Sequence, residues 1–227
     1  YKVLESFYRE TNSLDTAEKF LKKECLYGYD VKSENISRTK LNMFLVGDGH
    51  TNVSQRESLQ DDLDWESFDY ILANPPMGNG TIKAETTSIS TIRTEIAFLV
   101  RIIKLLKIGG KACVIMPDGF LENPSFADIR KEFLEKNDIE AIISLPKFAF
   151  APYTKEKTYA LFFQKRSSIE TKIQSKDIWM YIIDNDGYAN SDKRFPTKLR
   201  NSDGSWLHDE ISSFVNQNGE EKAGCLE

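Results

Sequence analysis

The sequence predicts an α/β protein with a mostly parallel sheet, and three observations lead to that prediction. Strand-like and helix-like segments alternate through most of the 227 residues, which is the pattern of right-handed βαβ units. The strand-like segments are short apolar runs that stop at turn residues. Two late strand-like segments have no helical pattern between them, which predicts an antiparallel edge on the sheet.

The composition is that of an ordinary globular protein and argues against several classes. The formal net charge of −5 argues against a protein that binds polyanions through surplus cations. No apolar run approaches the roughly 18 residues of a membrane span, and we see no secretory leader, so no membrane partner is expected. The cysteines are odd in number and far apart, which excludes a disulfide framework and indicates a cytoplasmic location: Cys25, Cys113 and Cys225.

The first part of the chain is predicted to form two helices around a short strand. A helix is expected over 13–25, with Ser13 as its cap, followed by a strand from Leu26 to Asp30. A second helix is expected over 33–46, ending at Gly47, with these residues facing inward: Ile36, Leu41, Phe44 and Leu45. Residues 47–66 are polar and are expected to form a loop.

The middle of the chain begins with a compact apolar strand, Phe68–Ala73. This strand must stop at Asn74-Pro75-Pro76, because proline has no N–H to donate to a sheet. Residues 77–91 have the composition of a mobile loop. A helix comes next, closed by Gly109-Gly110, with an apolar stripe formed by Ile92, Ile96, Leu99, Ile103 and Leu106.

The remaining elements continue the alternation. We expect a helix at 125–136 and, on the same periodicity arguments, strands at 111–116, 139–145, 158–165 and 178–183. Residues 200–227 show no clear pattern.

Ligands of such sheets bind beyond the carboxyl ends of the strands, and three polar segments are expected there. Asn74-Pro75-Pro76-Met77 forms a rigid corner whose Asn74 side-chain oxygen and a proline carbonyl can accept both hydrogens of a planar NH2 group. Accepting both hydrogens draws the nitrogen lone pair out of conjugation and makes it nucleophilic. An ordinary strand-terminating turn is the alternative for this segment.

Two acidic residues complete the candidate site. Asp30, at the end of a strand, stands where nucleotide-binding folds hold ribose hydroxyls, although a first-turn acid of the next helix fits equally. Asp48, between Gly47 and Gly49, can accept a hydrogen bond from an adenine amino group, and a simple turn is its alternative.

Five segments, in order, resemble the catalytic subunit of type I restriction–modification enzymes. They are Leu45-Val46-Gly47-Asp48-Gly49-His50-Thr51-Asn52, Asn74-Pro75-Pro76, Met116-Pro117-Asp118-Gly119, Ile139–Pro146, and Phe150-Ala151-Pro152-Tyr153-Thr154 with Lys157-Thr158. The resemblance covers roughly residues 26–185. It implies a Rossmann-like class I fold that uses S-adenosylmethionine to methylate the exocyclic amino group of adenine in double-stranded DNA, beside a specificity subunit and a restriction subunit.

The resemblance also implies a role for each site residue. Asp30 would hold the cofactor ribose and Asp48 its adenine, while Asn74 and Pro75 would hold the target amino group, without a metal. The target base must leave the helix stack, and Phe150, with Tyr153 in reserve, is expected to stack on it. Lys155 and Lys157 could contact phosphate, although a solvated loop is the simpler interpretation.

The sequence departs from the family at two places. Met77 replaces an aromatic residue, and the family's first strand with its glycine-rich loop is missing before Asp30. We therefore expect residues 1–200 to be a partial methyltransferase domain and 201–227 a tail or the start of a helical segment. Two other functions stay open: methylation of a protein glutamine amide, and an inactive assembly module of the restriction complex.

Overall fold

The computed structural model describes residues 4–6, 10, 19–47, 52–60, 64, 66–77, 93–167, 177–183, 186 and 188–194, and the backbone alone at 81–83 and 91–92. The chain divides into two compact units, Tyr1–Leu63 and Asp64–Glu227, which we call unit 1 and unit 2. No helix among the described residues is long and apolar enough to cross a membrane.

Unit 1 contains a two-stranded parallel sheet with a helix between its strands. A single π-helical turn, η1 (Leu21–Cys25), precedes β1 (Gly28–Asp30), α3 (Ser33–Leu45) and β2 (Val53–Gln55). The strands pair from Gly28 opposite Val53 to Asp30 opposite Gln55. The strand ending at Asp30 and the helix after it are therefore confirmed, whereas β2 lies where the sequence predicted a loop.

The inward face predicted for α3 is largely wrong. Ile36 is buried, but Leu41, Phe44 and Leu45 are exposed in the structure. Their spacing predicted an apolar stripe that packs on a sheet. Of the predicted stripe, only Ile36, near the start of α3, is buried.

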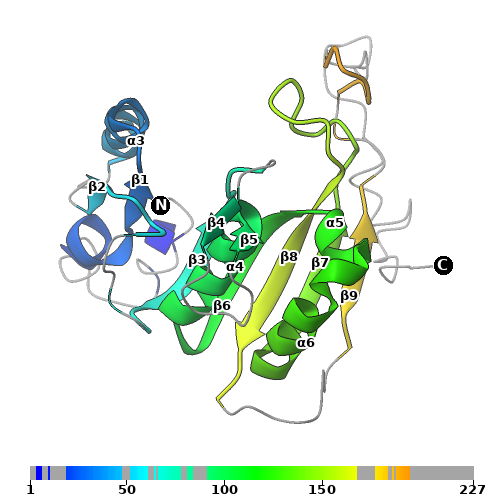
Figure 1. Ribbon diagram of the computed structural model, residues 1–227. Helices are drawn as coiled ribbons and strands as arrows, with labels where there is room; N and C mark the ends of the chain where they lie inside the picture. The colour runs from blue at the N-terminus through cyan, green and yellow to red at the C-terminus, as the bar shows by residue number, and fades with distance from the viewer. Residues whose placement is uncertain are drawn as a thin grey trace, which may run out of the picture. The chain divides into compact units, whose positions relative to one another are not determined.

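Unit 2 is built on a five-stranded sheet with the order β3-β6-β8-β7-β9 (Figure 1). Its strands are β3 (Phe68–Ala73), β6 (Leu106–Pro117), β7 (Asn137–Ser144), β8 (Thr158–Lys165) and β9 (Trp179–Ile182). Its helices are α4 (Thr94–Leu105), α5 (Gly119–Glu122), the 3-10 turn η2 (Pro124–Phe126) and α6 (Ala127–Lys136). A short antiparallel pair joins β4 (Thr81–Lys83), in the stretch predicted to be a loop, to β5 (Thr91–Arg93). β5 contains Ile92, which was predicted as the first residue of the helical stripe, so that part of the prediction is wrong.

The sheet is mostly parallel, as predicted, but the antiparallel strand is not at its edge. β3 and β6 are parallel, β7 and β9 are parallel, and β8 runs antiparallel to both β6 and β7 between them. The predicted antiparallel edge is therefore wrong. β8 returns directly from β7 without a crossover helix, so it enters the sheet between two strands of the opposite direction.

Gly109 and Gly110 do not end the predicted helix. α4 stops at Leu105, and both glycines lie inside β6. Gly109 has a φ of +79°, and a Cβ on Gly110 would lie 3.1 Å from the carbonyl oxygen of Asp69. The pair therefore allows β6 to pass close to β3 at the point where their register shifts.

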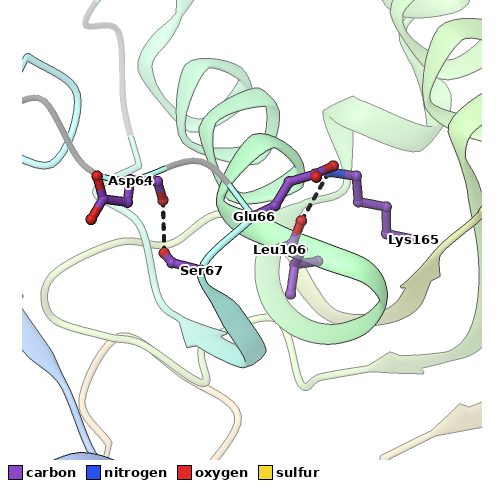
Figure 2. Close-up of polar contacts among 5 residues, drawn as sticks. All are labelled: Asp64, Glu66, Ser67, Leu106 and Lys165. Atoms are coloured by element: carbon purple, nitrogen blue, oxygen red, sulfur yellow. Dashed lines mark hydrogen bonds and ion pairs between the residues drawn. The ribbon is translucent and has the colours of Figure 1, made fainter.

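The carboxyl end of α4 is closed by groups from two other segments (Figure 2). The N–H groups of Glu66 and Ser67 donate to the carbonyl oxygens of Lys104 and Leu105 at 3.1 and 3.0 Å. The Lys165 ammonium donates to the Leu106 carbonyl oxygen at 2.8 Å and pairs with the Glu66 carboxylate at 3.0 Å. These donors satisfy carbonyl groups that a helix end leaves without partners.

The core lies between the sheet and the helices. Ile96, Leu99 and Ile102 of α4 are buried, and Phe133 of α6 meets the ring of Phe163 edge-on at 5.0 Å. β3 is the last strand on its side of the described sheet, where Tyr70 and Leu72 are 74% and 84% exposed. The expectation that the first strand is absent stays a prediction.

Candidate functional site

The loops at one edge of the unit 2 sheet carry most of the predicted site residues. The carboxyl ends of β3, β6 and β7 lie at this edge, together with the amino end of β8, because β8 runs in the opposite direction. Asn74 follows β3, Asp118 follows β6, and residues 145–157 connect β7 to β8. The structure therefore brings Asn74 and the segment of Phe150 to the same edge, as predicted.

The Asn-Pro-Pro-Met turn begins where the sequence predicted it. β3 ends at Ala73, so Asn74 is the first residue beyond the sheet. Asn74 and Pro76 are exposed, Pro75 is buried and Met77 is half-buried. The buried proline anchors the turn, while the Asn74 amide stays accessible at the edge. The Asn74 side-chain oxygen can therefore accept a hydrogen bond from an incoming group.

The loop between β7 and β8, residues 145–157, is held firmly at its base, and we call it the target loop. The Leu145 N–H donates to the Thr158 carbonyl oxygen at 3.0 Å, and the Asp118 N–H donates to the Lys157 carbonyl oxygen at 2.9 Å. The Lys157 ammonium also donates to the Leu145 carbonyl oxygen. The base of the target loop is thus joined to the turn that follows β6.

The tip of the target loop presents the two predicted stacking residues differently. The Phe150 carbonyl oxygen accepts from the N–H groups of Tyr153 and Thr154 at 2.9 and 3.2 Å, which closes a turn around the cis Ala151-Pro152 peptide. The Phe150 side chain is half-buried, whereas Tyr153 is 94% exposed. Of the two rings, Tyr153 is the one that an approaching molecule can reach without displacing protein.

Two of the three lysines of the target loop, Lys155 and Lys157, make polar contacts in the structure. Lys157 donates to the Leu145 carbonyl oxygen, and the Lys155 ammonium pairs with the Asp192 carboxylate. Both lysines therefore hold the loop in the described structure. A direct phosphate contact by either lysine stays a prediction.

Glu95 is a buried acid near the same edge that the sequence did not single out. It lies in the first turn of α4, is 1% exposed, and pairs with the Arg93 guanidinium at 2.6 Å through one oxygen, while its Oε2 has no hydrogen-bond partner. Burial raises the pKa of the Glu95 carboxyl above its ordinary value. An acid at a helix start is common on exposed surfaces, so no signal in the sequence indicated this burial.

Tyr159 is a second buried polar group near this edge. It follows the first residue of β8, is 1% exposed, and its hydroxyl has no hydrogen-bond partner. Burial, reinforced by the nearby Asp118 charge, raises the pKa of the Tyr159 hydroxyl well above its ordinary value. The hydroxyl therefore stays protonated and is no candidate for a base.

In unit 1, Asp30 lies at the carboxyl end of β1, as predicted. One carboxylate oxygen accepts from the Lys32 N–H at 2.7 Å, and the other accepts from the Asn35 side-chain amide at 3.0 Å. The bond from the Lys32 N–H and the bond from Asn35 lower the pKa of the Asp30 carboxyl. The carboxylate is thus ionised and fixed in orientation. Each oxygen keeps a lone pair that can accept from a ligand.

Asp48 lies outside the described residues, but its place in the chain bears on its predicted role. It precedes β2, whereas ligands of parallel sheets bind beyond the carboxyl ends of strands. The acid that follows β2 is Glu57, and its neighbour Arg56 donates its N–H to the Asp30 carbonyl oxygen at 3.1 Å. The sequence did not lead us to Glu57, because β2 was not predicted; a strand over Val53–Gln55 would have been the signal.

A scan against protein-family models matches residues 6–223 to the family described as N-6 DNA Methylase. This match covers nearly the whole sequence. The chain belongs to the N-6 DNA methylase family. The resemblance found from the five sequence segments is thereby confirmed.

Curated relatives of this N-6 DNA methylase include methylase subunits of type I restriction enzymes. The EcoEI methylase subunit of Escherichia coli is 32% identical over 160 residues, which are 67% of this chain and 31% of the relative. The EcoKI methylase subunit of Escherichia coli K12 is 34% identical over 119 residues, which are 49% of this chain and 22% of the relative. The chain thus spans a third or less of the length of these relatives.

Solved structures give the same family likeness. A chain from a study of complex assembly and conformational transition of the type I restriction–modification system matches with a TM-score of 0.65 and 27% identity, covering 78% of this chain and 37% of that one. The EcoKI M protein matches with a TM-score of 0.60 and 25% identity, covering 77% and 39%. A class I S-adenosylmethionine-dependent methyltransferase from Listeria monocytogenes, 16% identical with a TM-score of 0.56, shares the fold.

Proposed function

We propose that this N-6 DNA methylase chain is part of the catalytic domain of a type I modification subunit that methylates the exocyclic amino group of adenine in double-stranded DNA. The observation that carries the proposal is the exposed Asn74 amide on its buried Pro75, at the same sheet edge as the target loop. A site for a planar amino group and a loop with an exposed aromatic side chain, Tyr153, suit transfer to a flipped base.

The Asn74 turn supplies the positioning. The Asn74 side-chain oxygen and the Pro75 carbonyl oxygen are proposed to accept the two hydrogens of the target amino group. This arrangement favours a pyramidal nitrogen whose lone pair faces the methyl donor, and it works by orientation and electrostatics rather than by a covalent intermediate. Pro76 keeps the corner rigid and Met77, half-buried, packs below the base in place of an aromatic ring.

The described residues fit S-adenosylmethionine at the acid after β1. The Asp30 carboxylate is ionised and pre-oriented by Lys32 and Asn35, and its remaining lone pairs suit the two donor hydroxyls of a ribose. Glu57, after β2, is proposed in place of Asp48 as the acid that accepts from the adenine amino group. The cofactor when bound supplies an electrophilic methyl group.

The target base is proposed to stack against the tip of the target loop. Tyr153 is fully accessible, and Phe150 lies half-buried behind it. An aromatic face at this place compensates the flipped base for the stacking it loses in the duplex, about 1–3 kcal/mol per base.

The partners follow from the relatives. We propose that this protein acts with a specificity subunit, which reads the DNA sequence, and with a restriction subunit, because its relatives are methylase subunits of type I restriction enzymes. The cytoplasmic location expected from the cysteines is part of the same proposal.

The cofactor part of the proposal is tested by calorimetric titration of S-adenosylmethionine into the protein. We expect binding that Asp30→Ala and Glu57→Gln weaken about tenfold or more each, as for lost hydrogen bonds to charged acceptors. Asp48→Ala decides between the two acids, since a residue before β2 should not alter affinity. Binding lost in Asp48→Ala and retained in Glu57→Gln would reverse this assignment.

The reaction itself is tested with radiolabelled methyl donor in the assembled modification enzyme. Label in adenine of duplex DNA supports the proposal. Label in protein instead would indicate methylation of a glutamine amide, and label in neither substrate would indicate an assembly module.

A further inference from the structure

The segment that follows β9 emerges beside the target loop. β9 pairs in parallel with β7, with Ile182 opposite Ser144, and the Ile183 N–H donates to the Ser144 carbonyl oxygen at 2.9 Å. The chain therefore leaves β9 at the edge where the target loop leaves β7. In Figure 1 the orange segment stands next to the yellow-green loop. We call residues 186 and 188–194 the brace segment.

Two side chains of the brace segment contact the target loop. The Asn190 Oδ1 atom accepts from the Phe148 N–H at 3.3 Å, and the Asp192 carboxylate pairs with the Lys155 ammonium. Phe148 lies two residues before Phe150, and Lys155 lies two residues after Tyr153. The two contacts therefore bracket the tip that carries both aromatic side chains.

The brace segment is also closed on itself. The Arg194 guanidinium pairs with the Asp186 carboxylate and lies 5.0 Å from the centre of the Tyr188 ring. The Tyr188 N–H donates to the Asp186 Oδ1 atom at 3.2 Å. Arg194 thus joins the end of the brace segment to its beginning, on the two sides of Asn190 and Asp192.

The tip of the target loop has few other constraints. Its N–H groups make turn bonds within the loop, from Ala149 to Pro146, from Ala151 to Phe148 and from Tyr153 to Phe150. Tyr153 is 94% exposed, so its own packing cannot hold the tip in place. A tip that is ordered before the base arrives loses less conformational entropy on binding.

We propose that the brace segment is a positioning element for the target base, with Asn190 and Asp192 as positioning residues that act through Phe148 and Lys155. The proposal rests on the proposed function of the target loop. In this proposal the segment after β9 contributes to DNA methylation by orienting Phe150 and Tyr153. It does not contact the reacting atoms.

The Asn190 contact is tested by hydrogen exchange of backbone amides in the intact protein. In Asn190→Ala the Phe148 amide should exchange about fivefold faster, as expected for the loss of roughly 1 kcal/mol of hydrogen bonding. Asn190→Asp keeps an acceptor oxygen and should keep the protection. Equal exchange in Asn190→Ala and the wild-type protein would overturn the contact.

The Asp192 contact is tested by exchanging the two charges. Asp192→Lys places two ammonium groups together and should lower kcat/KM for DNA about two- to fivefold, mainly through KM, as for the loss of a surface ion pair. The double variant Lys155→Asp with Asp192→Lys restores opposite charges at unchanged net charge and should recover the wild-type value. A double variant as impaired as the single one would overturn the proposal.

The matched control is Asp177→Lys. It makes the same charge change on an exposed residue before β9, at the opposite edge of the sheet, and should leave KM unchanged. An equal effect in Asp177→Lys would show that overall charge, and not the brace segment, sets KM. Wild-type protein that does not methylate DNA would count against the proposed function, whereas normal kinetics in Asp192→Lys would count against the brace segment alone.

Discussion

The Asp118 N–H donates to the Lys157 carbonyl oxygen at 2.9 Å and so joins the turn after β6 to the last residue of the target loop. Lys157 in turn donates its ammonium to the Leu145 carbonyl oxygen on the other side of the same loop. The turn after β6 and the two ends of the target loop are thus fixed to one another at the candidate site. The stacking residues therefore stand on a base that the centre of the sheet supports.

Replacement of Asn74 by alanine should abolish methyl transfer without unfolding the protein. The side chain is exposed and no packing depends on it, whereas its oxygen is proposed to orient the target amino group. We expect kcat to fall by about 100-fold or more while cofactor affinity stays within about twofold. Asn123→Ala is the control, because Asn123 accepts from the Ser125 N–H at 2.9 Å and its loss should affect stability only. Turnover retained in Asn74→Ala would remove the assigned role.

Asp30 should stabilise unit 1 in a pH-dependent way. Its bonds with Lys32 and Asn35 lower the pKa of the carboxyl below the ordinary value of 3.8, so the carboxylate stabilises the folded state above that value. This contribution is lost as the pH falls through the folded pKa. The difference in unfolding free energy between wild-type protein and Asp30→Asn should therefore be constant near neutral pH and shrink in acid. Chemical denaturation of the two proteins at several acidic pH values checks this, and a difference that grows as the pH falls would contradict it.

Glu95 should have the opposite pH dependence. Burial raises the pKa of its carboxyl above the ordinary 4.5, so the carboxyl binds a proton more readily in the folded state than in the unfolded state. Stability from this group is present below the unfolded pKa and is lost as the pH rises through the folded value. Glu95→Gln should thus gain stability relative to the wild-type protein as the pH rises. Denaturation at several pH values checks this, with the exposed Glu122→Gln as control. A variant that loses stability with rising pH would show that the Arg93 pair outweighs burial.

Lys165 should contribute to the stability of unit 2 through the closed end of α4. In Lys165→Met the Leu106 carbonyl oxygen loses its donor and Glu66 loses its partner, while the aliphatic volume is kept. We expect the unfolding free energy to fall by about 1–2 kcal/mol. The exposed Lys131→Met on α6 should change it little. Equal unfolding midpoints for the two variants would show that water replaces the lost donor at no cost.

Much of the sheet could be predicted because its strands end at residues, such as proline, that cannot continue a strand. The prolines after Ala73 ended β3 where the structure ends it, and the apolar run Thr158–Lys165 gave β8 without error. The lack of a predicted crossover helix before β8 did not indicate that β8 lies inside the sheet. Its nearly continuous apolar sequence, Tyr-Ala-Leu-Phe-Phe, was the better signal, because only a strand buried on both faces needs it.

Site residues could be predicted from the sequence where they lie at the end of a predicted strand. Those at other positions could not. Asn74 follows β3 and Asp30 ends β1, and the sequence predicts both strands. The position of these residues at a sheet edge could therefore be expected. Glu57 follows a strand of three residues with a single apolar side chain, Val53, which no periodicity can reveal. The burial of Glu95 and the contacts of Asn190 and Asp192 depend on packing between distant segments, which local patterns do not contain.

The reversed direction of β8 has a consequence for how such enzymes can diversify. A connection between parallel strands must cross the sheet, so a change in its length disturbs the packing of the crossover helix. The target loop instead leaves and re-enters the sheet at adjacent strands, and its two ends are joined by the bond from the Leu145 N–H to the Thr158 carbonyl oxygen at 3.0 Å. The interior of the target loop can therefore be lengthened, shortened or replaced by that of a relative without changing the strands around it.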